Sequence, residues 1–169
     1  RKGGVIVAAT DGQMRELEAE GASFANHGAA HAALIDRTTS DDYVARARSD
    51  VERGMTRLRE ELEPLESVFA YPYGEFNEAI IAVIDDLGYK LAFGQQSGAI
   101  GPMSRLLALP RYPINEAYAS IADFRTRVRS LPLPVERVDP PENEIETRLP
   151  LVTFELPGGI DSGDYPGLA

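Results

Sequence analysis

Cysteine is absent from the 169-residue sequence, and histidine occurs only twice. Without cysteine the protein can neither use thiolate chemistry nor bind zinc through thiolates, and it is compatible with oxidising and reducing compartments alike. The sequence also lacks any apolar run near the roughly 18 residues that would indicate a transmembrane helix. We therefore expect no membrane span.

Positive charge is scarce in this protein. Lys and Arg number 17 against 27 Asp and Glu, which gives a formal net charge of −10. This balance argues against a nucleic-acid partner, because binding to phosphates needs clustered Lys and Arg side chains. It suits a cation, or a substrate that is neutral or positively charged.

The length corresponds to one ordinary domain, with room for a small appendage. A chain of this size buries about 68–70% of its unfolded surface, so it needs neither a disulfide nor a metal to form a core. The sequence shows no signal peptide, and residues 1–4 (Arg-Lys-Gly-Gly) are not a natural start. We therefore expect a truncated or processed chain.

Both histidines stand in one short stretch, as His27 and His31. A spacing of four residues places two imidazoles on the same side of a turn, where they can reach one divalent cation at about 2.0–2.1 Å. The residues between them, 28–30, are small and leave room for a ligand. A zincin helix would need Glu after the first histidine, but position 28 is Gly. Two imidazoles are too few for a zinc site, so a further ligand, preferably a carboxylate, must come from elsewhere.

Alternating short and long apolar patterns indicate an α/β fold. Apolar runs predict strands at residues 5–9, 22–26, 68–71, 91–93 and 106–109. Apolar positions three and four apart predict helices at residues 13–20, 41–62, 78–87 and 119–129. Ser40 or Thr39 can cap the second helix, and Asn77 can cap the third. This order predicts a parallel sheet or barrel with right-handed crossovers.

The composition changes at residue 131. Residues 131–134 and 139–143 are rich in proline and resemble a linker. Residues 151–156 alternate like one strand of an antiparallel sheet. We therefore divide the chain into a domain at residues 1–130 and, at residues 131–169, a linker with the start of a small β domain.

Three motifs stand in a fixed order along the first domain. Asn-His-x-x-x-His at residues 26–31 follows a strand, Phe-Ala-Tyr-Pro-Tyr-Gly occupies residues 69–74, and Leu-Pro-Arg occupies residues 109–111. This order resembles the polysaccharide deacetylase family, the NodB-like domain of carbohydrate esterase family four. Residues 21–27 and 87–93 are similar to this family in running sequence, and the resemblance covers roughly residues 4–130. The linker and strand after it resemble the accessory β domain of some bacterial members.

The resemblance implies a deformed (β/α) barrel that hydrolyses acetyl groups from a polysaccharide, with N-acetylated amino sugars as the favoured substrate. It also implies a divalent metal, preferably zinc, with His27 and His31 as ligands. The family's Tyr-Gly motif matches Tyr73 and Gly74, which gives the backbone N–H of Tyr73 the role of stabilising the oxyanion. A metal that polarises the acetyl carbonyl and an N–H donor at the developing charge fit that chemistry. The resemblance further implies a periplasmic, cell-envelope or secreted protein.

The acidic and basic motifs depart from the family pattern. The family's Phe-Asp-Asp motif, which supplies the third ligand and the base, would lie before residue 1. Asp11 also follows a predicted strand, but this strand does not correspond to the one that carries the family's acidic motif. The Arg that often precedes the Pro-Tyr-Gly motif is Ala70 here, and Arg111 either supplies that charge or is a surface residue. We therefore expect this segment alone to bind metal weakly and to show no deacetylase activity.

Two further departures concern histidine and its neighbours. No histidine follows His31, so the late catalytic histidine of many members is missing. The Ser or Thr usual after the first histidine is Gly28, which we expect to loosen substrate contact. The general acid therefore differs or lies outside this segment.

Three hypotheses remain open from the sequence. The first is a metal-dependent N- or O-deacetylase, in which Tyr71, Pro72, Tyr73 and Gly74 contact the sugar. The second is a non-catalytic carbohydrate-binding or structural descendant of the fold, with His27 and His31 as relics. The third is a plain α/β domain with an accidental histidine pair. Tyr71 in particular is compatible with a sugar groove or with a core tyrosine whose hydroxyl is bonded.

Overall fold

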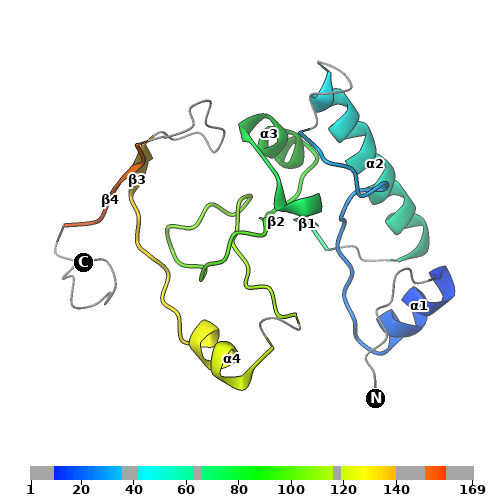
Figure 1. Cartoon of the computed structure of the whole chain (residues 1–169). Helices are drawn as coiled ribbons and strands as arrows, with labels where there is room; N and C mark the ends of the chain where they lie inside the picture. Colours follow the sequence, from blue (N-terminus) through cyan, green and yellow to red (C-terminus); the bar gives the residue numbers. More distant parts are fainter. Residues whose placement is uncertain (1–9, 36–41, 63–65, 116–118, 140–150, 159–169) are drawn as a thin grey trace.

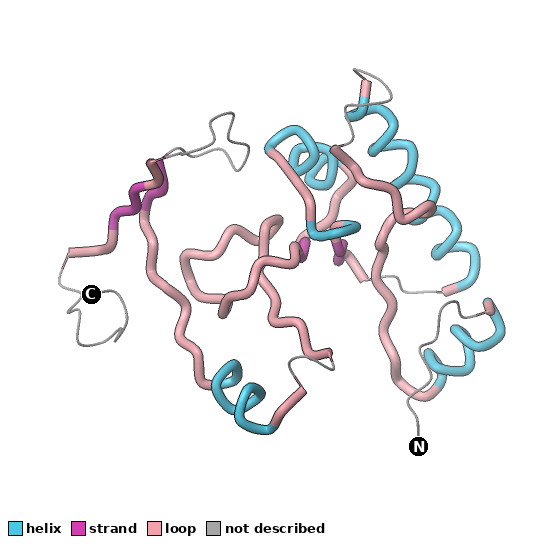
Figure 2. Tube along the Cα trace, viewed as in Figure 1, coloured by secondary structure: helices cyan, strands magenta, loops and turns pink. Residues whose placement is uncertain are grey.

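The computed structural model describes residues 10–35, 42–62, 66–115, 119–139 and 151–158. In the described part of residues 10–130, two helices come first, short strands and helices follow, and long loops join them (Figures 1 and 2). The elements are α1 (Asp11–Ala19), α2 (Tyr43–Glu61), β1 (Val68–Ala70), the 3₁₀ turn η1 (Pro72–Gly74), α3 (Glu78–Asp86), β2 (Leu91–Phe93), α4 (Ile121–Val128), β3 (Arg137–Asp139) and β4 (Thr153–Glu155). The predicted strand at residues 5–9 lies outside the described residues.

Parallel strands form the centre of the molecule (Figure 1). β1 pairs with β2 in the register Val68 to Leu91, and single parallel bridges join Asn26 to Phe69 and Phe93 to Leu109. Four parallel segments therefore lie side by side, which confirms the predicted α/β class. The strands predicted at residues 22–26 and 106–109 are wrong in extent, because each is reduced to one bridge. Among the described residues the sheet is small and does not close into the expected barrel.

The core lies where α2 and α3 pack against each other and against the strands. Each helix contributes one apolar face, as the three-and-four spacing predicted. The most deeply buried members are Val51 of α2, Ile80 and Ile84 of α3, and Phe69, Tyr71 and Ala92 from the strands and the end of β1. Such a core fixes the carboxyl ends of the strands relative to α2.

Helix caps agree with the sequence at α3 and differ at α2. Asn77 caps α3 as predicted, because its side-chain oxygen accepts the N–H of Ile80 at 3.0 Å. Asp42 caps α2 by accepting the N–H of Ala45 at 3.2 Å. The predicted caps, residues 39 and 40, lie outside the described residues. The correction follows from the helix beginning at Tyr43, which makes Asp42 the adjacent polar residue.

Helix α1 has no buried residue, and salt bridges join it to α2. The Arg57 guanidinium lies 2.5 Å from the Asp11 carboxylate, and Arg15 pairs with Glu61. Hydrogen bonds from Arg15 and Arg57 hold the pKa of the Glu61 carboxyl below its ordinary value. Ion pairs therefore attach α1 to the longest helix.

The C-terminal part forms a second, separate pairing. β3 and β4 run antiparallel, with Val138 opposite Phe154, which confirms the predicted antiparallel strand near residue 153. Residues 131–135 have no regular structure. The division at residue 130 remains a prediction. Within the described residues, no helix combines the length and apolarity that crossing a bilayer requires.

Replacing Asn77 by Ala should destabilise the fold. The change removes the cap of α3, which typically costs about 0.5–2 kcal/mol, and Asn77 is also buried against the Tyr43 hydroxyl at 3.1 Å. Urea denaturation measures the free energy of unfolding, with Asn77→Asp as the control that keeps a capping oxygen. Equal stability of Asn77→Ala and the parent would contradict the capping role.

Candidate active site

The two histidines lie together at the carboxyl end of the segment that bridges to β1. Their ring centroids are 4.8 Å apart, and the ring planes are inclined by 64°. His27 is half-buried and His31 is exposed. The predicted proximity of the two imidazoles is therefore present in the structure.

A backbone carbonyl fixes the orientation of the His27 ring. The Nδ1 atom lies 2.6 Å from the carbonyl oxygen of Ala70, the last residue of β1. Because a carbonyl oxygen can only accept, Nδ1 carries the hydrogen, and Nε2 of the neutral ring keeps its lone pair. Metal-binding histidines commonly donate their second N–H in this way. His27 is thus oriented for binding through Nε2.

The turn after β1 lies beside His31. The Tyr73 ring centroid is 4.7 Å from that of His31, and the Tyr73 side chain is 54% exposed. Tyr73 has a φ of 58°, in the left-handed region that tyrosine seldom adopts. Among the described residues its backbone N–H has no hydrogen-bond partner. The turn therefore offers an N–H donor and an aromatic ring next to the histidine pair.

Asn26 joins the histidine segment to three other parts of the fold. Its side chain donates to the carbonyl of Val51 at 2.9 Å and to the Tyr89 hydroxyl at 2.6 Å, and it accepts the N–H of Gly28 at 2.9 Å. Asn26 is only 1% exposed, so these bonds satisfy an amide that would otherwise be costly to bury. The start of the histidine turn is thereby held against α2.

Helix α2 approaches the same turn at two more positions. Asp50 accepts the N–H groups of Ala29 and Ala30, each at 3.1 Å. At Gly54 an added Cβ would lie 2.6 Å from the Asn26 side-chain oxygen and 3.2 Å from the backbone nitrogen of Ala29. Only glycine permits this close approach of helix and turn.

Asp50 and Gly54 were missed by the sequence reasoning, although a signal existed. Positions 47, 50, 51 and 54 fall on one face of a helix, and Ala47 and Val51 were among its predicted apolar positions. A carboxylate on that face must be buried and must therefore have a partner. Its partners could not be identified, because they lie 20 and 21 residues away in the chain.

Three predicted substrate contacts are buried in the structure. Tyr71 has no exposed surface and donates its hydroxyl to the carbonyl of Leu107 at 2.8 Å. Pro72 is fully buried, and Gly74 is buried with a φ of 73° and a Cβ position 2.5 Å from the backbone of Gln95. Burial also raises the pKa of the Tyr71 phenol. Tyr71 is therefore a core tyrosine, and Pro72 and Gly74 shape the turn rather than face a groove.

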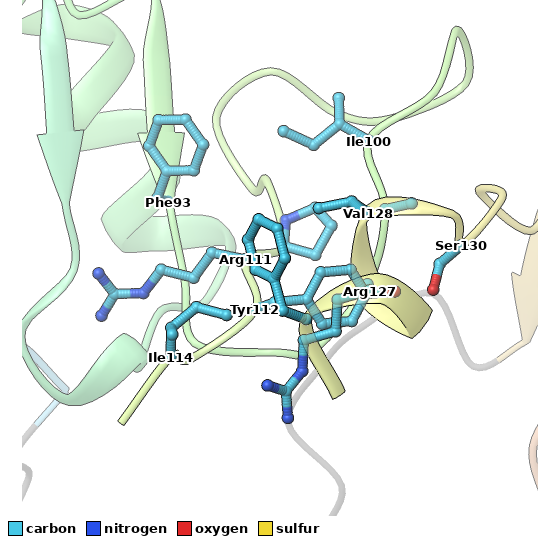
Figure 3. A pocket seen from close by; sticks show the side chains of 12 residues that line it. Phe93, Ile100, Arg111, Tyr112, Ile114, Arg127, Val128 and Ser130 are labelled. Atoms are coloured by element: carbon cyan, nitrogen blue, oxygen red, sulfur yellow. The ribbon is translucent and has the colours of Figure 1, made fainter. Parts of the chain in front are cut away.

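Arg111 lines a cavity whose lining does not include the histidine pair. The cavity has a volume of about 420 Å³ and lies between residues 93–114 and α4, with Tyr112, Phe124 and Arg127 among the other lining residues (Figure 3). The Arg111 backbone N–H donates to the carbonyl of Gln96 at 2.9 Å. In the described part of the chain it makes no hydrogen bond or ion pair with His27, His31 or Tyr73. The catalytic role predicted for Arg111 gains no support from this geometry.

The donor set fits part of a catalytic zinc site. Zinc takes imidazole nitrogens readily, and His27 and His31 present two from adjacent rings, one of them already oriented by a carbonyl. Within the described ranges, no group of three His, Cys, Asp or Glu side chains could hold a metal. The Asp50 carboxylate, which binds the turn between the histidines, is committed to backbone N–H groups. The pair therefore fits a metal as two ligands of a larger set.

Comparison with known proteins decides the family. The sequence model of the family described as polysaccharide deacetylase matches residues 3–92, more than half of the chain. The chain belongs to the polysaccharide deacetylase family. The matched range contains the histidine pair, Asp50 and the turn at residues 72–74, whereas Arg111 lies outside it.

Two solved structures are similar to this polysaccharide deacetylase. The Streptococcus pyogenes deacetylase PplD in complex with acetate is 27% identical, with a TM-score of 0.55, and the match covers 64% of this chain and 46% of that one. The deacetylase domain of BpsB from Bordetella bronchiseptica is 21% identical, with a TM-score of 0.56, over 61% of this chain and 48% of that one. The chain thus spans about half the length of these neighbours. None of the curated proteins gives a match.

Replacing Gly54 by Ala tests the close approach of α2. Alanine favours a helix over glycine by about 1 kcal/mol, whereas overpacking a tight contact costs about 1–3 kcal/mol. We expect the cost of overpacking against Asn26 to exceed the gain in helix propensity. Gly54→Ala should therefore lower the free energy of unfolding, measured in urea. Ser49→Ala, at an exposed position of α2, is the control for helix propensity. A Gly54→Ala protein more stable than the parent would show that helix and turn do not touch.

Proposed function

We propose that the protein is a metal-dependent hydrolase that removes acetyl groups from a polysaccharide, with N-acetylated amino sugars as the favoured substrate. The observation that supports this most is the proximity of His27, His31 and Tyr73. The centroid of the His31 ring lies 4.8 Å from that of His27 and 4.7 Å from that of Tyr73. All three residues fall in the range that matches the polysaccharide deacetylase family. PplD, the neighbour at 27% identity, was solved with acetate, which is the product of this reaction.

The proposed chemistry divides between a metal and the chain. When bound, zinc supplies a Lewis acid that polarises the acetyl carbonyl and makes water a stronger nucleophile. His27 and His31 would hold the ion, with the His27 ring kept in place by the Ala70 carbonyl. The Tyr73 N–H would donate to the acetyl oxygen as negative charge develops there. The exposed Tyr73 ring would pack against the sugar.

The surroundings of the site fit these roles. The left-handed φ of Tyr73 places a residue with an unused N–H at the end of β1, and buried Pro72 and Gly74 hold the turn on either side. We place the protein in the periplasm, the cell envelope or the extracellular medium, because that is where its polymeric substrate would be met. The third ligand, the base and the general acid remain unassigned.

A second candidate function is a non-catalytic carbohydrate-binding descendant of the fold. The absence of a third metal-binding side chain beside the pair, among the residues that the structure describes, favours it. Release of acetate from acetylated chito-oligosaccharide or acetylated xylan by the full-length protein separates the two candidates. Binding of these oligosaccharides without acetate release would favour the non-catalytic candidate.

Replacing His27 by Ala should weaken zinc binding. Loss of a residue that only orients a metal ligand typically lowers metal affinity by roughly 10–100-fold. Loss of a ligand itself should lower the zinc affinity by more than that. Competition with a chromogenic chelator at neutral pH, where the imidazoles can coordinate, measures the dissociation constant. Arg111→Ala is the control, since Arg111 makes no bond to the pair. Equal zinc affinity of His27→Ala and the parent would rule out this site.

The oxyanion role of Tyr73 requires a change that removes only its N–H. Proline is unsuitable, because its φ near −65° is incompatible with the observed 58°. Semisynthesis of the full-length enzyme can replace the peptide bond between Pro72 and Tyr73 by an ester, which puts an oxygen atom in place of the Tyr73 N–H. This loss of one donor should lower kcat by about 10²–10³. Tyr73→Phe keeps the donor and serves as the control, with most of the rate retained. A parent-like kcat for the ester would exclude the Tyr73 N–H from the reaction.

A further inference from the structure

Asp50 is a buried carboxylate in the middle of an otherwise apolar helix face. It is 7% exposed and stands beside Ala47, Val51 and Gly54, which are also buried. A carboxylate is costly to bury unless its oxygens are hydrogen-bonded. Its Oδ2 accepts the N–H of Ala29 at 3.1 Å, and its Oδ1 accepts the N–H of Ala30 at 3.1 Å.

One further partner neutralises the charge of Asp50. The Arg53 guanidinium, one helical turn further along α2, lies 2.6 Å from the Asp50 Oδ1 and remains largely exposed. Asp50 thus has an ion pair on the solvent side and two backbone N–H groups on the side of the turn. Hydrogen bonds to a charged acceptor are about twice as strong as neutral ones, so this contact is an effective tether.

The two tethered N–H groups belong to the segment that separates the histidines. Gly28 before them has a φ of 78°, and His31 after them has a φ of 49°. A left-handed histidine costs free energy and persists only when neighbouring contacts hold it. Two consecutive N–H groups that converge on one anion provide such contacts.

Gly28 also fits this arrangement. A Cβ at position 28 would lie 2.7 Å from the Asp50 Oδ2 and 3.7 Å from the Pro72 ring. A side chain there would displace the carboxylate from the turn. Glycine at position 28, in place of the family's Ser or Thr, therefore leaves the space that the Asp50 carboxylate occupies.

We propose that Asp50 is the positioning residue of the histidine pair: by binding the N–H groups of Ala29 and Ala30, it fixes the turn from which His27 and His31 bind metal. This role rests on the proposed metal site. Asp50 itself would not be a ligand, because its oxygens accept from Ala29, Ala30 and Arg53. Its effect is to preorganise the two imidazoles, so that little conformational freedom is lost when they bind.

The test uses Asp50→Asn in the full-length protein, with Zn²⁺ as the probe. The amide is nearly the same size, but it loses the charge and turns one acceptor into a donor that faces an N–H group. Chelator competition should show zinc binding weakened by roughly 10–100-fold. Hydrogen exchange at the Ala29 and Ala30 amides, measured by NMR without metal, should become faster. Both changes are specific to the turn.

Two control variants separate positioning from general effects. Glu52→Gln makes the same change of charge at an exposed position two residues along α2, and Ile84→Val loosens the core on α3. Both should keep the zinc affinity of the parent. If Asp50→Asn fails to fold, Asp50→Glu keeps the carboxylate but shifts it by one methylene, and it should also bind zinc more weakly.

The outcomes distinguish the two proposals. Zinc affinity equal to the parent's in folded Asp50→Asn, or in Asp50→Glu where that variant is used, would overturn the positioning role and leave the metal site standing. Equal weakening in Ile84→Val would likewise overturn it, because general destabilisation would then suffice. Failure of the parent itself to bind zinc would overturn the proposed function, and the positioning role with it.

Discussion

The contact between helix α2 and the turn that contains both histidines is the constraint on which the site depends. Three successive features of α2 meet this turn: the Asp50 carboxylate, the Val51 carbonyl that accepts from Asn26, and the bare backbone at Gly54. Two of them would be unfavourable alone, since a buried acid and a helical glycine both cost stability. Together they hold an irregular segment in which, among the described residues, only Asn26 bridges to a strand.

A second contact, on the other side of the turn, comes from the end of β1. The Ala70 carbonyl orients the His27 ring, and the left-handed Tyr73 brings its ring to His31. Because β1 is held between Asn26 and β2, its carboxyl end is fixed relative to α2. Sites in α/β folds generally lie at the carboxyl ends of parallel strands, and the histidine pair and Tyr73 lie at such an end here.

Local patterns predicted the parts of the fold that depend on local energetics. The α3 helix, with Asn77 before it and Gly88 after it at a φ of 85°, follows from capping and glycine rules alone. The strands at 22–26 and 106–109 were overestimated, because the length of a strand depends on partners that a local pattern does not specify. The proximity of His27 and His31 followed from their four-residue spacing, and the place of Tyr73 at the same site came from the family resemblance. The supporting Asp50 could not be predicted, because its partners lie at distant positions in the chain. Tyr71 was ambiguous because its burial is a tertiary property, settled by its bond to Leu107.

We propose that the two imidazoles, held by α2 and β1, bind one metal ion. X-ray absorption spectroscopy at the zinc edge of the zinc-loaded, full-length protein tests this directly. We expect imidazole scattering from two histidines, with zinc–nitrogen distances of about 2.0–2.1 Å. A spectrum explained by oxygen ligands alone, without imidazole scattering, would contradict it.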